Sequence, residues 1–273
     1  MRCISNIEIY YNEIEDTINF AHCCYSRVGQ CLGKMKSDDF INMPEKDFYD
    51  YLNKIAFIKP VDCYMLNPGK TCEEVWGSND EISIRVAISR ECNIHCPMCY
   101  ARYGGHHDSP KRKWLYLYTI EKLKNYKFNN LWLTDWGEAF IYLNEVLDIV
   151  KNYSYCKKIS ITTNATLMTK DLLLKLKNSC DQIFLEIDLD GLSKETLESV
   201  RVGADFNIVF KNIINAIQFS KKYPTNFEIA FHHTITKTNR CDLEKILSFA
   251  NKFKIPIHAG EEFEVPKESI FNY

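Results

Sequence analysis

Three cysteines stand close together in the segment CNIHCPMCY, residues 92–100. Cys92, Cys96 and Cys99 follow the spacing C-x3-C-x2-C, directly after an apolar-alternating run at residues 82–89. Thiolates select soft metals, and three of them on one loop leave one metal position open. This arrangement suits a 4Fe–4S cluster whose fourth iron takes a non-protein ligand. A zinc ion held by three thiolates and a fourth donor is the main alternative.

The same three positions would also lie on one face of an α-helix, where buried cysteines behave as small hydrophobic side chains. Pro97 argues against a helix, because it has no N–H to donate and disfavours the α conformation of Cys96. We therefore expect an irregular loop of metal ligands after a strand.

The composition is that of an ordinary globular protein. The chain has 273 residues, of which 46% are apolar, and a net charge of −2. These values allow one α/β barrel or two smaller domains and give no reason to expect nucleic-acid or membrane partners. The start lacks a basic segment followed by an apolar one, so we expect neither a secretion signal nor an anchor. We expect a cytoplasmic protein, whose twelve cysteines are ligands or reduced thiols rather than disulfides.

The first 80 residues form a cysteine-containing segment with weak periodicity. We expect one short helix over 38–52 and loops elsewhere. Five cysteines there either pack as small hydrophobic residues or hold a second metal centre, namely Cys23, Cys24, Cys31, Cys63 and Cys72. We divide the chain into an N-terminal extension, 1–80, which binds an auxiliary cluster or the substrate, and a second domain, 81–273.

From residue 82 onward, strand and helix patterns alternate. We expect strands at 82–89, 130–135, 158–164, 182–190, 227–235 and 255–260 and helices at 115–126, 143–153, 170–178, 208–222 and 242–253. Such alternation predicts βα units and a parallel sheet, either curled like a barrel or doubly wound.

The two faces of the strands favour the curled sheet. One face is apolar, whereas the other carries polar residues almost throughout, among them Ser160, Thr162, Glu186 and Asp188. A doubly wound sheet would bury both faces under helices, so a polar face indicates an occupied, partly wet interior. Mutual neutralisation of Arg85, Glu186 and Glu228 is the plainer alternative. The carboxyl ends of the strands, where barrel active sites lie, carry Asn164, Asp188, Asp190 and either His232 or Thr234.

In its cysteine loop and in the polar residues at its strand ends, the sequence resembles the radical S-adenosylmethionine (radical SAM) superfamily, in particular its SPASM and molybdenum-cofactor-biosynthesis-like branch. The cysteine loop looks like the family's signature. The segments TDWGEA, TNA and IDLDG with a downstream arginine resemble further family motifs in the family's order, at 134–139, 163–165, 187–191 and Arg201. Alanine replaces the family's usual proline at Ala139 and its usual glycine at Ala165, and Asp188 replaces a serine.

The resemblance implies a partial (β/α)6 TIM-like barrel behind the N-terminal extension. It implies that Cys92, Cys96 and Cys99 bind a 4Fe–4S cluster and that S-adenosylmethionine completes it. The residues that match the family's cofactor motifs are Trp136, Gly137, Glu138, Asn164, Asp188 and Arg201. A second Fe–S cluster would use the N-terminal cysteines.

The implied activity is that of an oxidoreductase that cleaves S-adenosylmethionine to a 5′-deoxyadenosyl radical, which abstracts hydrogen from a substrate. We expect a peptide substrate and a one-electron donor such as flavodoxin or ferredoxin; no catalytic acid or base can be assigned. Radical oxidation or rearrangement of a small metabolite such as a sugar is the alternative. A binding module stabilised by zinc or an Fe–S cluster is the non-enzyme alternative.

Overall fold

The computed structural model describes residues 7–21, 31–56, 82–99, 107–133 and 137–261. Within them a single sheet of nine strands has the order β3-β2-β1-β4-β5-β6-β7-β8-β9. Cys23, Cys24, Cys63, Cys72 and Trp136 lie outside the described residues, as does the predicted boundary at residues 80 and 81. Cys31 begins strand β3, but its side chain is also outside the description.

Six parallel strands, each joined to the next by helical segments, form the larger part of the sheet. The strands are β4 (Ser83–Ala87), β5 (Asn130–Leu133), β6 (Lys158–Thr163), β7 (Gln182–Asp188), β8 (Phe227–Ile235) and β9 (Ile257–Glu261). The helices are α4 (Pro110–Lys122), α5 (Leu143–Val150), α6 (Lys170–Ser179), α7 (Lys194–Val200), α8 (Phe206–Lys222) and α9 (Leu243–Phe253). The predicted alternation is confirmed, and α7 is an additional helix. In the described residues the sheet ends at β3 and β9 without closing, so the barrel is partial.

The N-terminal segment continues this sheet, which corrects the expectation of loops. Strand β1 (Ile7–Asn12) pairs parallel to β4, and β2 (Thr17–Ala21) and β3 (Cys31–Lys36) follow antiparallel. Short strands among turn and cysteine residues carry too little periodicity to stand out, although Ile7, Ile9 and Phe20 are fully buried.

The predicted single helix over 38–52 is wrong, because two helices occupy this region. Helix α1 (Ser37–Asn42) ends where Met43 is extended, with φ −65° and ψ 125°, and α2 (Glu45–Ala56) begins after Pro44. A residue before proline disfavours the α conformation, so the chain turns at this point.

Short polar caps begin several of the helices. The side chain of Ser109 accepts a hydrogen bond from the backbone N–H of Arg112, directly before Pro110 at the start of α4. Thr169 caps α6 and Asp205 caps α8 in the same way. Such caps fix the points at which the chain leaves each strand and enters its helix. Among the described residues, no helix is both long and apolar enough to cross a membrane.

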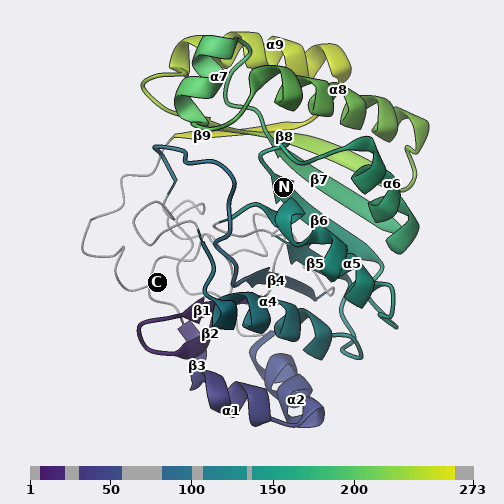
Figure 1. Ribbon diagram of the computed structural model, residues 1–273. Coiled ribbons are helices and arrows are strands. Elements are labelled where there is room, and N and C mark those ends of the chain that lie inside the picture. The colour runs from purple at the N-terminus through teal and green to yellow at the C-terminus, as the bar shows by residue number, and fades with distance from the viewer. Residues whose placement is uncertain (1–6, 22–30, 57–81, 100–106, 134–136, 262–273) are drawn as a thin grey trace, which may run out of the picture.

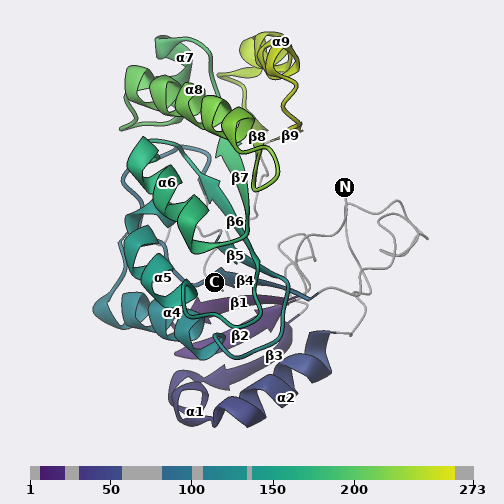
Figure 2. The ribbon, with the colours of Figure 1, turned by 90° about the vertical axis from the view of Figure 1, so that its right-hand side faces the viewer.

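The helices cover one face of the curved sheet. Figures 1 and 2 show α4, α5, α6 and α8 along the same outer side of the strands. Strand residues that point to this side, such as Ile84, Ile159, Leu185 and Phe231, are fully buried in one hydrophobic core. The predicted apolar face therefore packs on the helices.

The opposite face of the strands is polar and partly exposed. Glu186 accepts a hydrogen bond from Thr162 Oγ1 at 3.1 Å, and its other oxygen lies 3.0 Å from His258 Nδ1. Arg85 pairs with Glu8 at 3.9 Å, while Glu228 is exposed. Glu186 therefore has hydrogen-bond partners on β6 and β9.

Candidate functional site

The cysteine loop follows β4 and is irregular, as its proline predicts. The backbone N–H of Cys99 donates to the carbonyl of Cys96 at 3.0 Å, which forms a tight turn around Pro97. All three cysteines are free thiols; Cys96 is buried and the other two are half-buried. The N–H of His95 donates to the carbonyl of Val202 at 2.8 Å, so the loop is also attached to the segment after α7.

Two buried charged residues hold the base of this loop. The carboxylate of Asp108 accepts hydrogen bonds from Ser89 Oγ and from the N–H of Arg90, both at 2.7 Å. Arg112 is 2% exposed and donates to the carbonyl of Ile88 at 2.9 Å. Burial raises the pKa of Asp108. Neither residue was among the sequence-based candidates, because the predicted helix begins only at residue 115. The available signal was a pair of opposite charges four residues apart around Pro110, a proline that suits the first position of a helix.

The backbone of the loop after β5 packs directly on the cysteine loop. The N–H of Glu138 donates to the carbonyl of Glu91 at 2.7 Å. A Cβ added to Gly137 would lie 2.3 Å from that same carbonyl oxygen, so only glycine permits this approach. The two loops that the sequence assigns to cluster and cofactor therefore lie together.

The side chain of Glu138 is buried and joins two strand ends. Its carboxylate accepts from Thr163 Oγ1 and from the N–H of Asn164, both at 2.7 Å, and from the N–H of Phe140 at 3.1 Å. Burial raises the pKa of Glu138 to about 7, although these hydrogen bonds oppose the rise. Both carboxylate oxygens of Glu138 are therefore engaged within the protein.

Asn164 extends from the end of β6 toward the cysteine loop. Its Nδ2 lies 3.9 Å from Cys92 Sγ and 3.3 Å from Asn93 Oδ1. Its Oδ1 accepts from the N–H of Thr166 at 2.9 Å, which fixes the amide orientation. Ala165 has φ 63°, in the left-handed region that favours glycine, and this accounts for the glycine of the family motif at that position.

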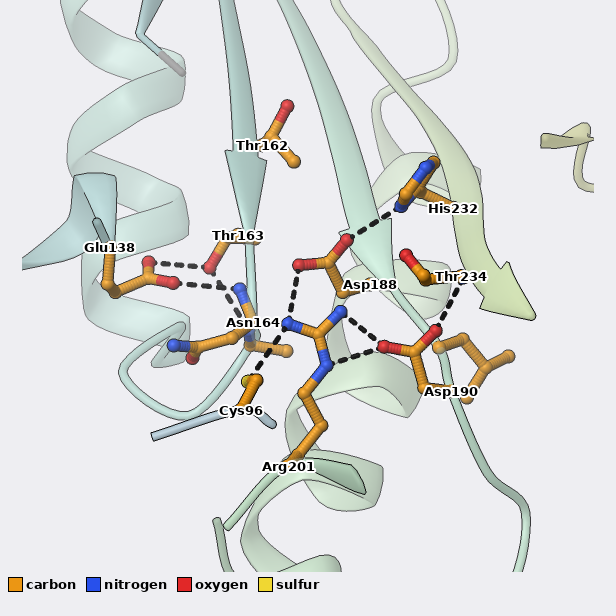
Figure 3. A network of polar contacts seen from close by, with 12 residues as sticks. Cys96, Glu138, Thr162, Thr163, Asn164, Asp188, Asp190, Arg201, His232 and Thr234 are labelled. Carbon is orange, nitrogen blue, oxygen red and sulfur yellow. Dashed lines mark hydrogen bonds and ion pairs between the residues drawn. The ribbon is translucent and has the colours of Figure 1, made fainter. Parts of the chain in front are cut away.

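Arg201 lies at the centre of the polar network in Figure 3. Its Nη1 is 3.1 Å from Asp188 Oδ2 and 3.7 Å from Cys96 Sγ, while Nε and Nη2 face Asp190 Oδ2. Asp190 is fully buried, and its other oxygen accepts from the N–H of Thr234 at 2.8 Å. Asp190 thus orients Arg201. The sequence motif alone did not distinguish this role of Asp190 from that of a residue in a simple turn.

His232 extends this network along the polar face. Its Nδ1 lies 3.0 Å from Asp188 Oδ1. Burial lowers the pKa of His232, but the neighbouring carboxylate of Asp188 more than offsets this effect and raises it to about 9. Strand pairing places His232 opposite both Asp188 on β7 and His258 on β9. A row of polar side chains, Asp188, His232 and His258, therefore crosses β7, β8 and β9.

The donor set suits an Fe–S cluster. Three thiols share one loop, and N–H groups of Asn164 and Arg201 face two of the sulfurs. Among the described residues, no three His, Cys, Asp or Glu side chains are placed to hold a single metal ion. A cubane cluster has a different requirement, because each thiolate binds a different iron and the sulfurs need not converge. The assignment of Cys92, Cys96 and Cys99 as ligands stays a prediction.

A protein-family model described as the radical SAM superfamily matches residues 86–250. This range begins near the end of β4 and ends in α9, so it includes the cysteine loop and the parallel strands β5, β6, β7 and β8. The predicted superfamily is confirmed by this match.

Among curated proteins, the chain is similar to AlbA of Bacillus subtilis (strain 168), the antilisterial bacteriocin subtilosin biosynthesis protein. The two are 34% identical over 123 residues, which cover 42% of this chain and 25% of AlbA. The chain therefore aligns with a quarter of the length of that relative.

Solved structures share the fold. The crystal structure of SuiB from Streptococcus suis bound to S-adenosylmethionine has a TM-score of 0.52 at 13% identity, covering 98% of this chain and 65% of SuiB. The structure of anSMEcpe with bound AdoMet gives a TM-score of 0.48 at 17% identity, over 66% of this chain and 51% of that one. The chain spans about half to two thirds of these proteins.

Proposed function

The chain belongs to the radical SAM superfamily, and we propose that it is an enzyme that abstracts a hydrogen atom from a peptide substrate. Members of this superfamily use a 4Fe–4S cluster together with S-adenosylmethionine. The observation that carries the proposal is the position of the cysteine loop. Cys92 Sγ lies 3.9 Å from Asn164 at the end of β6, and Cys96 Sγ lies 3.7 Å from Arg201 at the end of α7. The N–H of Glu138, after β5, donates to the carbonyl of Glu91 next to the first cysteine.

The chain's own residues bind, orient and shield the reacting groups. In this proposal Cys92, Cys96 and Cys99 hold the cluster, which when bound supplies the electron that cleaves S-adenosylmethionine to a 5′-deoxyadenosyl radical. The backbone at Gly137 and Glu138 lies close enough to the cysteine loop to hold the methionine amine.

The remaining cofactor contacts come from the ends of β6 and β7. Asp188 is partly accessible, whereas Asn164 is buried with its amide beside Cys92, and in this proposal the two contact the methionine carboxylate and the ribose. The assignments of Trp136 and Arg201 are carried by the motif resemblance, with Arg201 beside Asp188 in the same network. The polar face of β6 to β9 would then contact the substrate.

A peptide substrate is favoured over a sugar by the relative AlbA, whose name refers to biosynthesis of the bacteriocin subtilosin. A cytoplasmic location and a one-electron donor such as flavodoxin or ferredoxin belong to the same proposal, because free thiols and a reducible cluster require a reducing environment.

The test is anaerobic reconstitution with iron and sulfide, followed by dithionite and S-adenosylmethionine. We expect release of 5′-deoxyadenosine and methionine, and none from a variant with Cys92, Cys96 and Cys99 all replaced by alanine. A wild-type protein with full iron and sulfide that never releases 5′-deoxyadenosine would contradict the proposal.

The substrate class needs a separate experiment. Peptides encoded near the gene are added to the reconstituted protein, and their mass and binding are measured. A mass change that depends on S-adenosylmethionine supports a peptide substrate. Turnover of a sugar with no binding of any such peptide would instead support the small-metabolite alternative.

A further inference from the structure

Arg201 contacts two carboxylates and the sulfur of a predicted cluster ligand at the same time. Figure 3 shows its guanidinium group between Asp188, Asp190 and Cys96. The Nη1 atom lies 3.7 Å from Cys96 Sγ, within hydrogen-bonding distance for sulfur. The Arg201 side chain is 13% exposed, so water screens these charges only weakly. The positive charge of Arg201 therefore acts on Cys96 Sγ with little screening by solvent.

Asp190 fixes the direction in which Arg201 points. One carboxylate oxygen of Asp190 binds the guanidinium group, and the other accepts from the N–H of Thr234 and lies 3.3 Å from His233 Nδ1. The backbone carbonyl of Asp190 accepts from Asn239 Nδ2 at 3.1 Å. These contacts fix the position of the Asp190 carboxylate. The guanidinium group of Arg201 therefore cannot turn away from Cys96 without losing its contact with Asp190.

The path of the chain from Asp190 to Arg201 is also constrained. Gly191 packs on α7 so closely that an added Cβ would lie 2.6 Å from the backbone nitrogen of Leu197. The N–H of Arg201 donates to the carbonyl of Leu197 at 2.8 Å, and the next residue, Val202, accepts from His95 of the cysteine loop. The end of α7 and the cysteine loop thus form one unit.

This geometry bears on the reduction potential of a cluster. Reduction adds negative charge, so a cationic hydrogen-bond donor at a ligand sulfur stabilises the reduced form. Without Arg201, the carboxylates of Asp188 and Asp190 would stand uncompensated near the cluster and oppose the added electron. Both effects have the same sign, and loss of Arg201 lowers the potential.

We propose that Arg201, held by Asp190 and hydrogen-bonded to Cys96, raises the reduction potential of the cluster and so eases its reduction. The inference rests on the proposed function, because it requires that the three cysteines hold the cluster. It adds a role for Arg201 that does not depend on contact with S-adenosylmethionine.

The experiment is a potentiometric titration of the reconstituted cluster followed by electron paramagnetic resonance, without S-adenosylmethionine. We expect Arg201→Gln to reduce the ratio of reduced to oxidised cluster at least tenfold at the wild-type midpoint. This corresponds to a fall of about 59 mV for a one-electron couple. Arg201→Lys recovers part of the shift, because it restores the charge without the forked geometry.

Arg240→Gln is the matched control. It removes the same charge from an exposed pair with Glu261, and it should keep the wild-type midpoint. An Arg201→Gln protein with full iron and sulfide and an unchanged midpoint would overturn the inference.

A second measurement needs no substitution. Wild-type protein labelled with 15N-arginine should show a weak nitrogen coupling to the reduced cluster in pulsed electron paramagnetic resonance, and its absence would also overturn the inference. A wild-type chain that binds no cluster would overturn the proposed function as well, whereas an unchanged midpoint overturns only the role of Arg201.

Discussion

Gly137 lies so close to Glu91 that a Cβ on the glycine would be 2.3 Å from the glutamate carbonyl oxygen. That carbonyl also accepts the N–H of Glu138 at 2.7 Å. The loop after β5 is therefore joined to the cysteine loop through backbone atoms. Any side chain at position 137 must push the two loops apart.

The first prediction concerns this contact. Gly137→Ala should lower the free energy of unfolding by about 2 to 3 kcal/mol, because the backbone atoms that meet the new methyl group cannot rotate away. Gly260→Ala is the control, since nothing lies within 4 Å of its added Cβ. Urea titration under anaerobic conditions measures both, and equal stability of the two variants would contradict the contact.

The second prediction concerns the buried carboxylate of Glu138. Glu138→Gln replaces one acceptor oxygen by an NH2 group that faces N–H donors, and it should cost about 1 to 3 kcal/mol of stability. Glu145→Gln, which alters an exposed pair with Lys113, should change stability by no more than about 0.5 kcal/mol. A Glu138→Gln protein as stable as the Glu145→Gln control would show that the three hydrogen bonds contribute little.

The parallel part of the fold could be predicted because its signal is strong and local. Alternating residues on β6, β7 and β8 are apolar on one face and polar on the other, and long amphipathic helices separate them. Strands β1 to β3 could not be predicted in this way, because β1 is placed by pairing with the distant strand β4, where Ile7 lies opposite Ile84, and β2 and β3 pair in turn onto β1. Long-range pairing leaves little trace in a short window of sequence.

In the candidate site, too, some residues could be selected from the sequence and others could not. Cys92, Cys96 and Cys99 could be selected as candidates from their spacing and Pro97, and Asn164 and Asp188 from their positions at strand ends; their roles stay predictions. The pair of Asp108 and Arg112 could not be selected, because in sequence a buried ion pair with a spacing of four residues looks the same as a solvated one. The choice between ligand and structural role for Glu138 also required the atomic contacts of its carboxylate.

The third prediction uses the left-handed backbone at Ala165. Ala165→Gly relieves about 1 kcal/mol of strain, which offsets the lost methyl burial and the added freedom of the unfolded chain, so its stability should stay within about 0.5 kcal/mol of wild type. Ala216→Gly, in the middle of α8 and equally buried, should lose about 1.5 to 2 kcal/mol. Thermal or urea unfolding compares the pair, and equal losses would contradict the strain at Ala165.

The fourth prediction separates ligand cysteines from packing cysteines. Cys96→Ala should lose most of its iron and sulfide after reconstitution, while Cys156→Ala should retain the wild-type content. Cys156 is buried beside the carbonyl of Lys158, on the far end of β6 from the cysteine loop. Iron loss in both variants would indicate a folding defect instead of a ligand role.

The same measurement addresses the predicted second cluster. In the variant with Cys92, Cys96 and Cys99 all replaced, residual iron would support a centre at the N-terminal cysteines. Iron absent from this variant, but complete at one cluster in the wild type, would count against it.

The last prediction is a pH dependence of stability from His232. Its folded pKa, about 9, is above the usual imidazole value of 6.5, because Asp188 stabilises the charged ring. The folded protein therefore binds this proton more tightly than the unfolded chain does. The resulting stability is fully present below about pH 6.5 and is lost as the pH rises through about 9. Since the side chain is 33% exposed, we discount the full shift and expect about 1 to 2 kcal/mol.

The measurement compares wild type with His232→Gln in urea titrations at pH 6.5 and pH 9. Other titrating groups act in both proteins, so their effect cancels in the difference between the two pH slopes. We expect the wild type to lose about 1 to 2 kcal/mol more than the variant over this range. Equal slopes would mean that the pKa of His232 in the folded protein is close to its value in the unfolded chain, which would contradict this prediction.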